Sequence, residues 1–169
     1  MLASPRGDMP RALRLLGLAI DAVLVLLCAV MGLLVFFNVL SRFIFNLDVA
    51  WSGELVTFCL VWGSFLGGAA AVQRGAHMRV GELIEALPLR LRRILEALVL
   101  VATLALLGFV AWYGLAICQR TWGQETTVLY WPQGLLYAGM PLGAVLAMPF
   151  ILHDLLVLAR GRLPDWSDA

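Results

Sequence analysis

The sequence is poor in charge, histidine and cysteine and contains no lysine, and these shortages exclude several classes of protein. Only 14% of its 169 residues are charged, whereas 62% are hydrophobic. Soluble domains carry about 25% charged residues, so a water-soluble surface cannot be built from this composition. The formal net charge of +1 provides no basic field to attract nucleic acid. A lipid bilayer is therefore the expected surrounding, and no nucleic-acid partner is expected.

The few cysteines and histidines do not form a recognisable chemical site. Cys28, Cys59 and Cys118 are scattered through apolar stretches and are expected to be small buried hydrophobic residues. Together with His77 and His153 they give no metal-ligand spacing and no facing histidines for a haem. No nucleophile with a base and no central pair of carboxylates is present. We therefore expect no metal, no cofactor and no enzymatic activity.

Four apolar stretches are long enough to cross a bilayer, which requires roughly 20 residues each. Because an isolated strand would leave its backbone groups unpaired in lipid, each stretch is predicted to be helical. The first is too long for the apolar core of a cleaved signal peptide. The chain is therefore predicted to be an all-α integral membrane protein, a single compact bundle comprising residues 1–169. The predicted spans are residues 16–40, 54–72, 94–118 and 134–158.

The distribution of arginine predicts the orientation of these spans. Arginines concentrate before the first span, between the second and third, and after the fourth, whereas the other two connections hold one each. The positive-inside rule then places both termini in the cytoplasm. The two outer connections are rich in aromatic residues, as expected at a headgroup boundary. These aromatic residues are Trp51, Trp122, Tyr130 and Trp131.

The connection between the second and third spans contains a short amphipathic pattern. Val80, Leu83, Ile84 and Leu87 recur at helical spacing. This pattern predicts a helix over residues 79–87 that lies in the inner membrane interface. A solvated helix that touches no lipid is the alternative.

Small residues recur on single helix faces in two of the spans. The second span contains Gly63, Gly67 and Gly68 next to Trp62, and the fourth contains Gly139 and Gly143. Small residues allow two helix backbones to approach closely in lipid. The spacing alone leaves open whether these contacts form within this chain or with a partner protein.

Polar residues near the ends of the spans suggest local pairing. Asn38 and Arg42 lie one helical turn apart, and Glu54 begins the second span. We hypothesise that Arg42 and Glu54 form an ion pair across the outer turn. A favourable charge at the helix N-terminus is the alternative role for Glu54. Near the inner ends, Asp21, His153 and Asp154 are expected to pair with arginines rather than form a proton path.

Several short motifs follow one another in a fixed order along the chain. They are NVLSRFIF at 38–45, WSGEL at 51–55, FLGGA at 65–69 with Trp62, RGAHMRV at 74–80, which includes Arg74, Gly75 and His77, and MPLG at 140–143 with Gly123 and Pro132. Together these motifs resemble a known family, the small membrane subunit of tripartite ATP-independent periplasmic (TRAP) transporters. The segment 126–131 is bulkier than this family's pattern suggests.

The resemblance implies a bacterial inner-membrane complex with three components. A periplasmic binding protein would capture a small organic acid, and a large permease subunit, a separate chain, would move it with sodium. The present chain would brace the static part of that subunit in the lipid. The alternative is a free-standing four-helix protein such as a small proton-coupled exporter. Such an exporter normally carries a central acidic residue, whereas Asp21 and Asp154 are peripheral.

Overall fold

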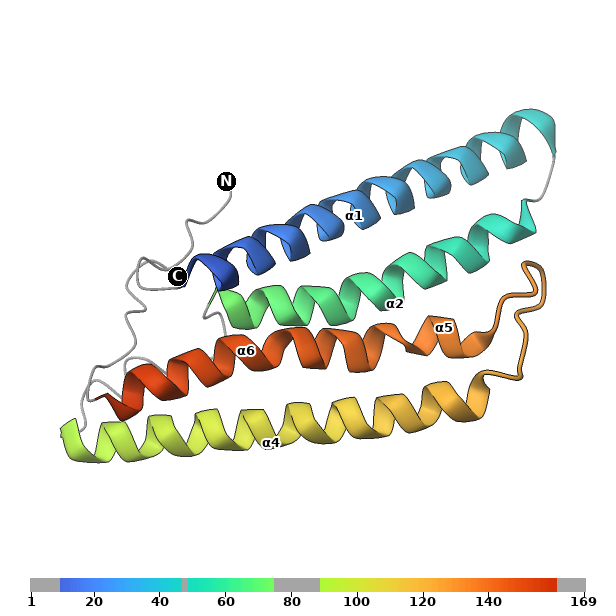
Figure 1. The fold of residues 1–169 in the computed structure, drawn as a ribbon. Coiled ribbons are helices and arrows are strands. Elements are labelled where there is room, and N and C mark those ends of the chain that lie inside the picture. Colours follow the sequence, from blue (N-terminus) through green and yellow to red (C-terminus); the bar gives the residue numbers. More distant parts are fainter. Residues whose placement is uncertain (1–9, 47–48, 75–88, 161–169) are drawn as a thin grey trace.

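The computed structural model describes residues 10–46, 49–74 and 89–160, with side chains from residue 91 onward in the last range. Its elements are α1 (Arg11–Phe45), α2 (Ala50–Gln73), α4 (Leu89–Thr121), α5 (Gln133–Tyr137) and α6 (Gly139–Ala159) (Figure 1). Four stretches are long and apolar enough to cross a membrane, and the last comprises α5 and α6. The prediction of an all-helical chain with four apolar helices is therefore confirmed. The predicted interfacial helix at 79–87 lies outside the described residues.

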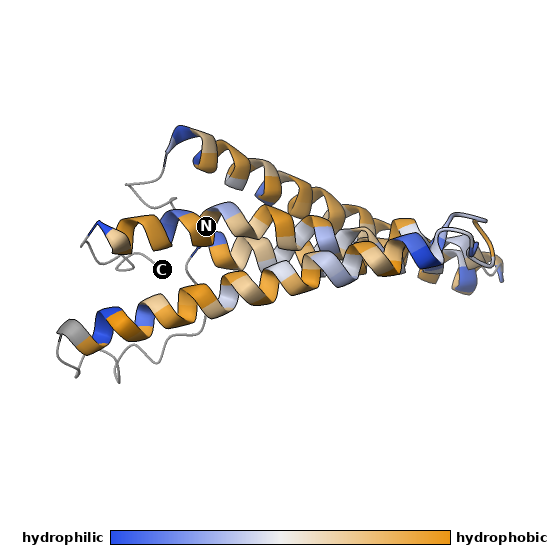
Figure 2. Ribbon diagram, turned by 60° about the horizontal axis from the view of Figure 1, so that its bottom comes forward, coloured by the Kyte–Doolittle hydropathy of each residue, from blue (hydrophilic) through white to orange (hydrophobic). Residues whose placement is uncertain are grey.

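Two of the helices are longer than a bilayer requires. α1 has 35 residues and α4 has 33, so each is about 50 Å long, whereas the hydrocarbon core is about 30 Å thick. These helices must either tilt or extend beyond the hydrocarbon at their ends. Hydrophilic residues gather near the helix ends, and hydrophobic residues dominate the middle (Figure 2).

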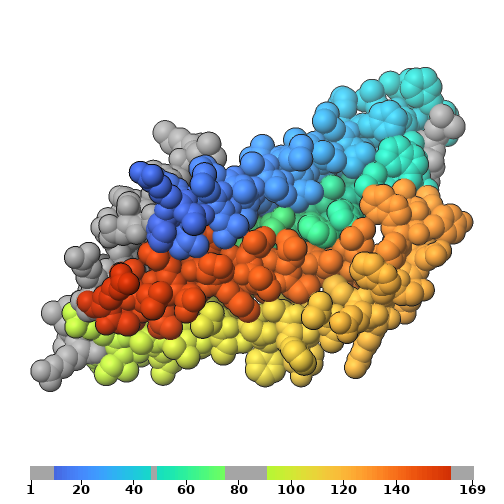
Figure 3. Space-filling view, viewed as in Figure 1, coloured from blue at the N-terminus to red at the C-terminus, as the bar shows by residue number. Residues whose placement is uncertain are grey.

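The helices lie in a row rather than in a closed four-helix bundle. α1 packs against α2, α2 against α6, and α6 against α4, and this order is visible in Figure 1. The space-filling view shows α6 between α1 and α4, with little of α2 exposed on that face (Figure 3). α1 lies at the edge of the row, where it buries only Gly17, Ile20 and Ser41 and makes most of its contacts with one neighbour.

The two ends of the row differ in composition. We call the end with the α1–α2 turn and the α4–α5 loop the aromatic end, and the opposite end the arginine end. The main hydrophobic core lies toward the arginine end, where all four spans contribute side chains. Phe150 is fully buried there, among Ile20, Ala69, Ala70, Val72, Leu100, Ala147, Ile151 and Leu158. Of the three cysteines, Cys59 and Cys118 are buried as expected, whereas Cys28 is exposed on α1.

Glycines in α6 determine how closely it approaches α2. A Cβ atom added to Gly143 would lie 2.7 Å from the carbonyl oxygen of Phe65, and one added to Gly139 would lie 3.2 Å from Cγ of Trp62. A real side chain cannot occupy those positions unless the helices move apart. Gly139 and Gly143 therefore serve packing within this chain, which answers the question left open by their spacing.

The glycines of α2 behave differently. A Cβ atom added to Gly63, Gly67 or Gly68 would meet nothing within 4 Å among the described residues. These residues are half-exposed or exposed. They do not mediate a helix contact within the described part of the chain.

The contrast between the two glycine sets predicts opposite effects of the same substitution. Gly143→Leu should destabilise the chain by about 1–3 kcal/mol because it overpacks the α2–α6 contact. Gly68→Leu is the matched control and should cause no loss of stability. Unfolding of both variants in detergent micelles, followed by circular dichroism, measures the difference. Equal stability of the two variants would contradict the observed packing.

Candidate interaction site at the aromatic end

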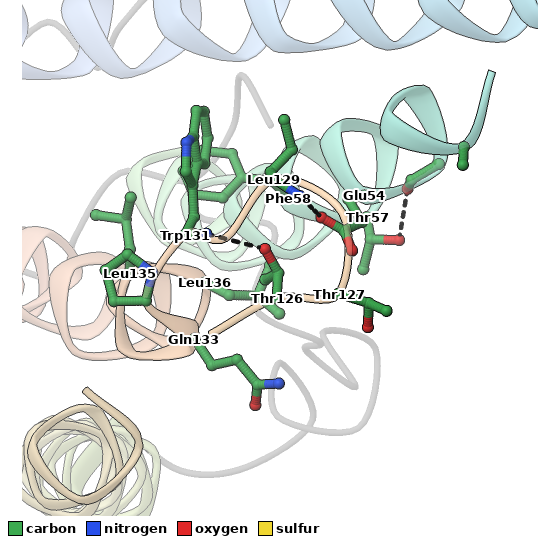
Figure 4. Close-up of a pocket in the computed structure, with 13 residues that line it drawn as sticks. Glu54, Thr57, Phe58, Thr126, Thr127, Leu129, Trp131, Gln133, Leu135 and Leu136 are labelled. Carbon is green, nitrogen blue, oxygen red and sulfur yellow. Dashed lines mark hydrogen bonds between the residues drawn. The ribbon is translucent and has the colours of Figure 1, made fainter. Parts of the chain in front are cut away.

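Glu54, in the first turns of α2, fastens the α4–α5 loop to that helix. One carboxylate oxygen accepts the backbone N–H of Val128 at 2.8 Å, and the other accepts that of Leu129 at 2.9 Å. Figure 4 shows the Glu54 carboxylate directed at this loop. Hydrogen bonds to an ionised acceptor are stronger than neutral ones. A residue of the second span thus positions a loop that lies some 74 residues later in the sequence.

The loop itself is a small hairpin, which we call the aromatic-end hairpin (residues 124–133). The Thr126 N–H donates to the Trp131 carbonyl at 2.8 Å, and the Gln133 N–H donates to that of Gln124 at 2.7 Å. The Thr126 hydroxyl also accepts the Trp131 N–H at 3.1 Å. Tyr130, at the turn, has a φ of 54°. This conformation is unfavourable for a bulky residue, so the surrounding hydrogen bonds must hold it in place.

Aromatic side chains join the hairpin to α2 and α5. The ring of Phe58 stacks on Trp62 with centroids 5.3 Å apart and meets Trp131 edge-on at 6.0 Å. The indole N–H of Trp62 donates to the carbonyl of Leu135 at 3.1 Å. Aromatic contacts of this kind add about 0.5–1.5 kcal/mol each beyond their buried area. Trp62, singled out in the sequence, is therefore part of the packing at this end.

Asn38 stabilises the neighbouring α1–α2 turn. Its side-chain amide donates to the hydroxyl of Ser52 and, at 3.4 Å, to the carbonyl of Val49. The Ser52 hydroxyl donates in turn to the same carbonyl at 2.7 Å. Ser52 is fully buried, so these bonds satisfy groups that neither water nor lipid can reach. Trp51 is 41% exposed beside this turn.

The hypothesised ion pair between Arg42 and Glu54 is not formed. Both oxygens of Glu54 face the aromatic-end hairpin, on the side of α2 toward α5, whereas α1 packs near Ser52. Arg42 is exposed in the last turn of α1, where a positive charge interacts favourably with the helix C-terminus. The sequence identified Glu54 correctly as a polar anchor at this end but assigned it the wrong partner.

At the arginine end one of the predicted pairings with arginine, that of Asp21, is present. Arg74 forms an ion pair with Asp21 at 2.6 Å and so joins the ends of α1 and α2. Arg92 pairs with the buried Glu96 at 3.2 Å within α4. His153 Nδ1 lies 3.8 Å from a carboxylate oxygen of its neighbour Asp154. Gly75 and His77, which follow Arg74 in the sequence motif at 74–80, lie outside the described residues.

A cavity of about 400 Å³ lies between the start of α2, the hairpin and α5; we call it the aromatic-end pocket. Its lining includes Glu54, Thr126 and apolar side chains (Figure 4). Gly53 is also among the lining residues. Glu54 is its one charged lining residue. Within the described ranges, no group of histidine, cysteine and acidic residues could hold a metal ion. The pocket thus offers shape and a single negative charge rather than a catalytic set.

These features define a class of protein: a multi-pass membrane protein whose polar groups fasten helices together. Residues 31–161 match the family described as tripartite ATP-independent periplasmic transporters, DctQ component, and the chain belongs to this family. It is accordingly a small permease subunit of a TRAP transporter and a multi-pass protein of the inner membrane. Membership of this family replaces the alternative interpretation as a free-standing exporter.

Three relatives illustrate the similarity. The chain is 37% identical over 98 residues to the C4-dicarboxylate TRAP transporter small permease protein DctQ of Vibrio cholerae, covering 54% of this chain and 42% of that protein. It is 26% identical to the ectoine TRAP transporter small permease protein TeaB of Halomonas elongata, and the match covers 63% of this chain and 56% of that protein. It is 29% identical to the isethionate TRAP transporter permease protein DctMQ of Oleidesulfovibrio alaskensis, covering 62% of this chain but only 17% of that longer protein.

The hydrogen bonds of Glu54 predict a loop that depends on its charge. Glu54→Gln keeps the size of the side chain but replaces one acceptor oxygen with an amide donor, so one backbone N–H loses its partner. Hydrogen exchange of the amides of Val128 and Leu129 should then become several-fold faster. Arg42→Gln is the control and should leave both amides protected. Faster exchange in the Arg42 variant as well would restore the ion-pair hypothesis.

Proposed function

We propose that this chain braces the static part of a large TRAP permease subunit, which takes up a small organic acid with sodium after delivery by a periplasmic binding protein. The observation that carries the proposal is the open glycine face of α2, at Gly63, Gly67 and Gly68. The glycines of α6 are covered by a neighbouring helix, as at Gly143, whereas Gly32 on α1 and Gly108 on α4 are open but stand alone on their faces. An uncovered set is suited to a further helix from another protein.

The composition of the other exposed faces supports this assignment. α1 and α4 expose large apolar side chains such as Phe36, Leu106 and Phe109, which are well suited to lipid chains. By contrast, the exposed face of α2 carries small residues on either side of Leu60. Ser64 and Thr57 on this face are bonded back to their own helix. Lipid gains little from contact with such residues, whereas a second helix can pack closely on them.

The relatives support the partners and the kind of solute. The isethionate protein is a much longer permease that contains a region similar to this chain, which suggests that this region works against a large permease. The names of the three relatives specify C4-dicarboxylate, ectoine and isethionate. Because similar small subunits serve such different solutes, we assign solute selection and sodium coupling to the other components.

We further propose that both termini and the 73–93 connection between the second and third spans face the cytoplasm. The arginine end carries Arg11, Arg14, Arg74, Arg92, Arg93 and Arg160, whereas Arg42 and Arg120 lie near the aromatic end. This asymmetry supports the orientation by the positive-inside rule. The aromatic-end hairpin would then face the periplasm, where the binding protein approaches.

Assembly of the complex tests the proposed face. Gly67→Leu should leave the isolated chain folded but reduce co-purification of the large permease and sodium-driven uptake into proteoliposomes several-fold. Uptake should be lost when this chain is left out. Gly108→Leu, at another glycine with open space around it, on α4, is the matched control and should leave both measurements unchanged.

Two results would contradict the proposal. The first is transport by this chain alone in liposomes, which would remove the bracing role. The second is equal assembly of the Gly67 and Gly108 variants with the large permease, which would place the contact on another surface.

A further inference from the structure

We propose that the aromatic-end pocket is a binding site for a phospholipid with a primary-amine headgroup. The ammonium group would lie against Glu54, and the start of an acyl chain would lie along Phe58, Leu135 and Leu136. This inference concerns the chain in a membrane and does not depend on the proposed function.

The depth of the pocket matches the boundary between headgroups and hydrocarbon. α2 has 24 residues and is about 36 Å long, so it exceeds the hydrocarbon core by only a few residues. Glu54 is the fifth residue of the helix, which places it within about one turn of the boundary between headgroups and hydrocarbon, and Phe58 lies one turn deeper. Trp131, which also lines the pocket, is of the type that gathers at this boundary.

The walls of the pocket favour an apolar occupant over water alone. Phe58, Trp131, Leu135 and Leu136 are among its lining residues. The volume of about 400 Å³ is many times the roughly 30 Å³ that a water molecule occupies. A Cβ atom added to Gly53 would meet nothing within 4 Å, so the pocket is accessible along that side of α2.

The charge of the pocket selects the headgroup. Glu54 is the one charged side chain in its lining. The backbone N–H groups of Val128 and Leu129 donate to it, and so do the side chain of Thr126 and the backbone of Thr127. These donors carry no net charge, so the carboxylate keeps the negative charge that a primary ammonium group complements. The hydroxyl of Thr127 and the amide of Gln133, which also line the pocket, are donors suited to the phosphate.

A lysine of a partner protein carries the same ammonium group, but the observations favour the lipid. The charged and apolar parts of the pocket are arranged along the direction of α2, with the charge nearer the end of the helix. A phospholipid in the surrounding bilayer has the same order of groups along the same direction. A single lysine side chain would satisfy the carboxylate but would leave the apolar part unfilled.

The test counts lipids retained by the purified full-length chain. After delipidation, the chain is exposed to mixed micelles that contain phosphatidylethanolamine, phosphatidylcholine or phosphatidylglycerol, and bound lipid is counted by native mass spectrometry. Phosphatidylethanolamine should be retained at least several-fold more than the other two, because the choline group has no N–H and phosphatidylglycerol is anionic. Gly53→Phe should abolish this preference by filling the accessible side, whereas Gly68→Phe, also exposed on α2, should preserve it.

Hydrogen exchange of Val128 and Leu129 verifies that the Gly53 variant keeps its hairpin in place. Equal retention of phosphatidylethanolamine and phosphatidylcholine would overturn the role of Glu54, and unchanged preference in the Gly53 variant would overturn the location. Displacement of the lipid by the large permease, together with a cross-link from residue 53 to that subunit, would assign the pocket to a protein partner instead.

Discussion

The close contact between α2 and α6 is the constraint on which the rest of the structure depends. Gly143 lies against the backbone of Phe65, and Gly139 lies against Trp62, so the two helices approach more closely than any side chain would allow. This approach brings the indole of Trp62 to the carbonyl of Leu135. The start of α5 is thereby fixed beside α2, and the hairpin before it comes within reach of Glu54. Gly139 and Gly143 thus help to position the hairpin for its hydrogen bonds with Glu54.

The attachment of α1 follows a different principle. Near its ends, α1 is held by polar contacts, through Asp21 with Arg74 and through Asn38 with Ser52. Between them its most apolar stretch buries none of its residues within the chain. These two polar contacts hold a helix that buries only three of its residues within the chain. The long apolar surface of α1 is consequently available for lipid or for another protein.

The sequence predicted the number and type of helices because the length and hydropathy of each span are local properties. It also identified Asn38, Glu54 and the two glycines of α6 as important for contacts. It could not predict that the helices lie in a row, because periodicity states which face is apolar but not which neighbour covers it. The partner of Glu54 was missed for a related reason. Its contacts are backbone N–H groups of the hairpin, and a backbone donor leaves no signal in residue type.

The aromatic-end pocket and the open glycine face share one side of α2. Gly53, Thr57, Ser64 and Gly68 follow one another at helical spacing and are all exposed, so they lie along a single face. A large permease that packs on this face would therefore pass close to the accessible side of the pocket. A lipid bound beside Glu54 would lie at the edge of such a contact, with its headgroup held by this chain. The exposed face of α2 therefore offers neighbouring positions for a bound lipid at Gly53 and for a partner helix near Gly68.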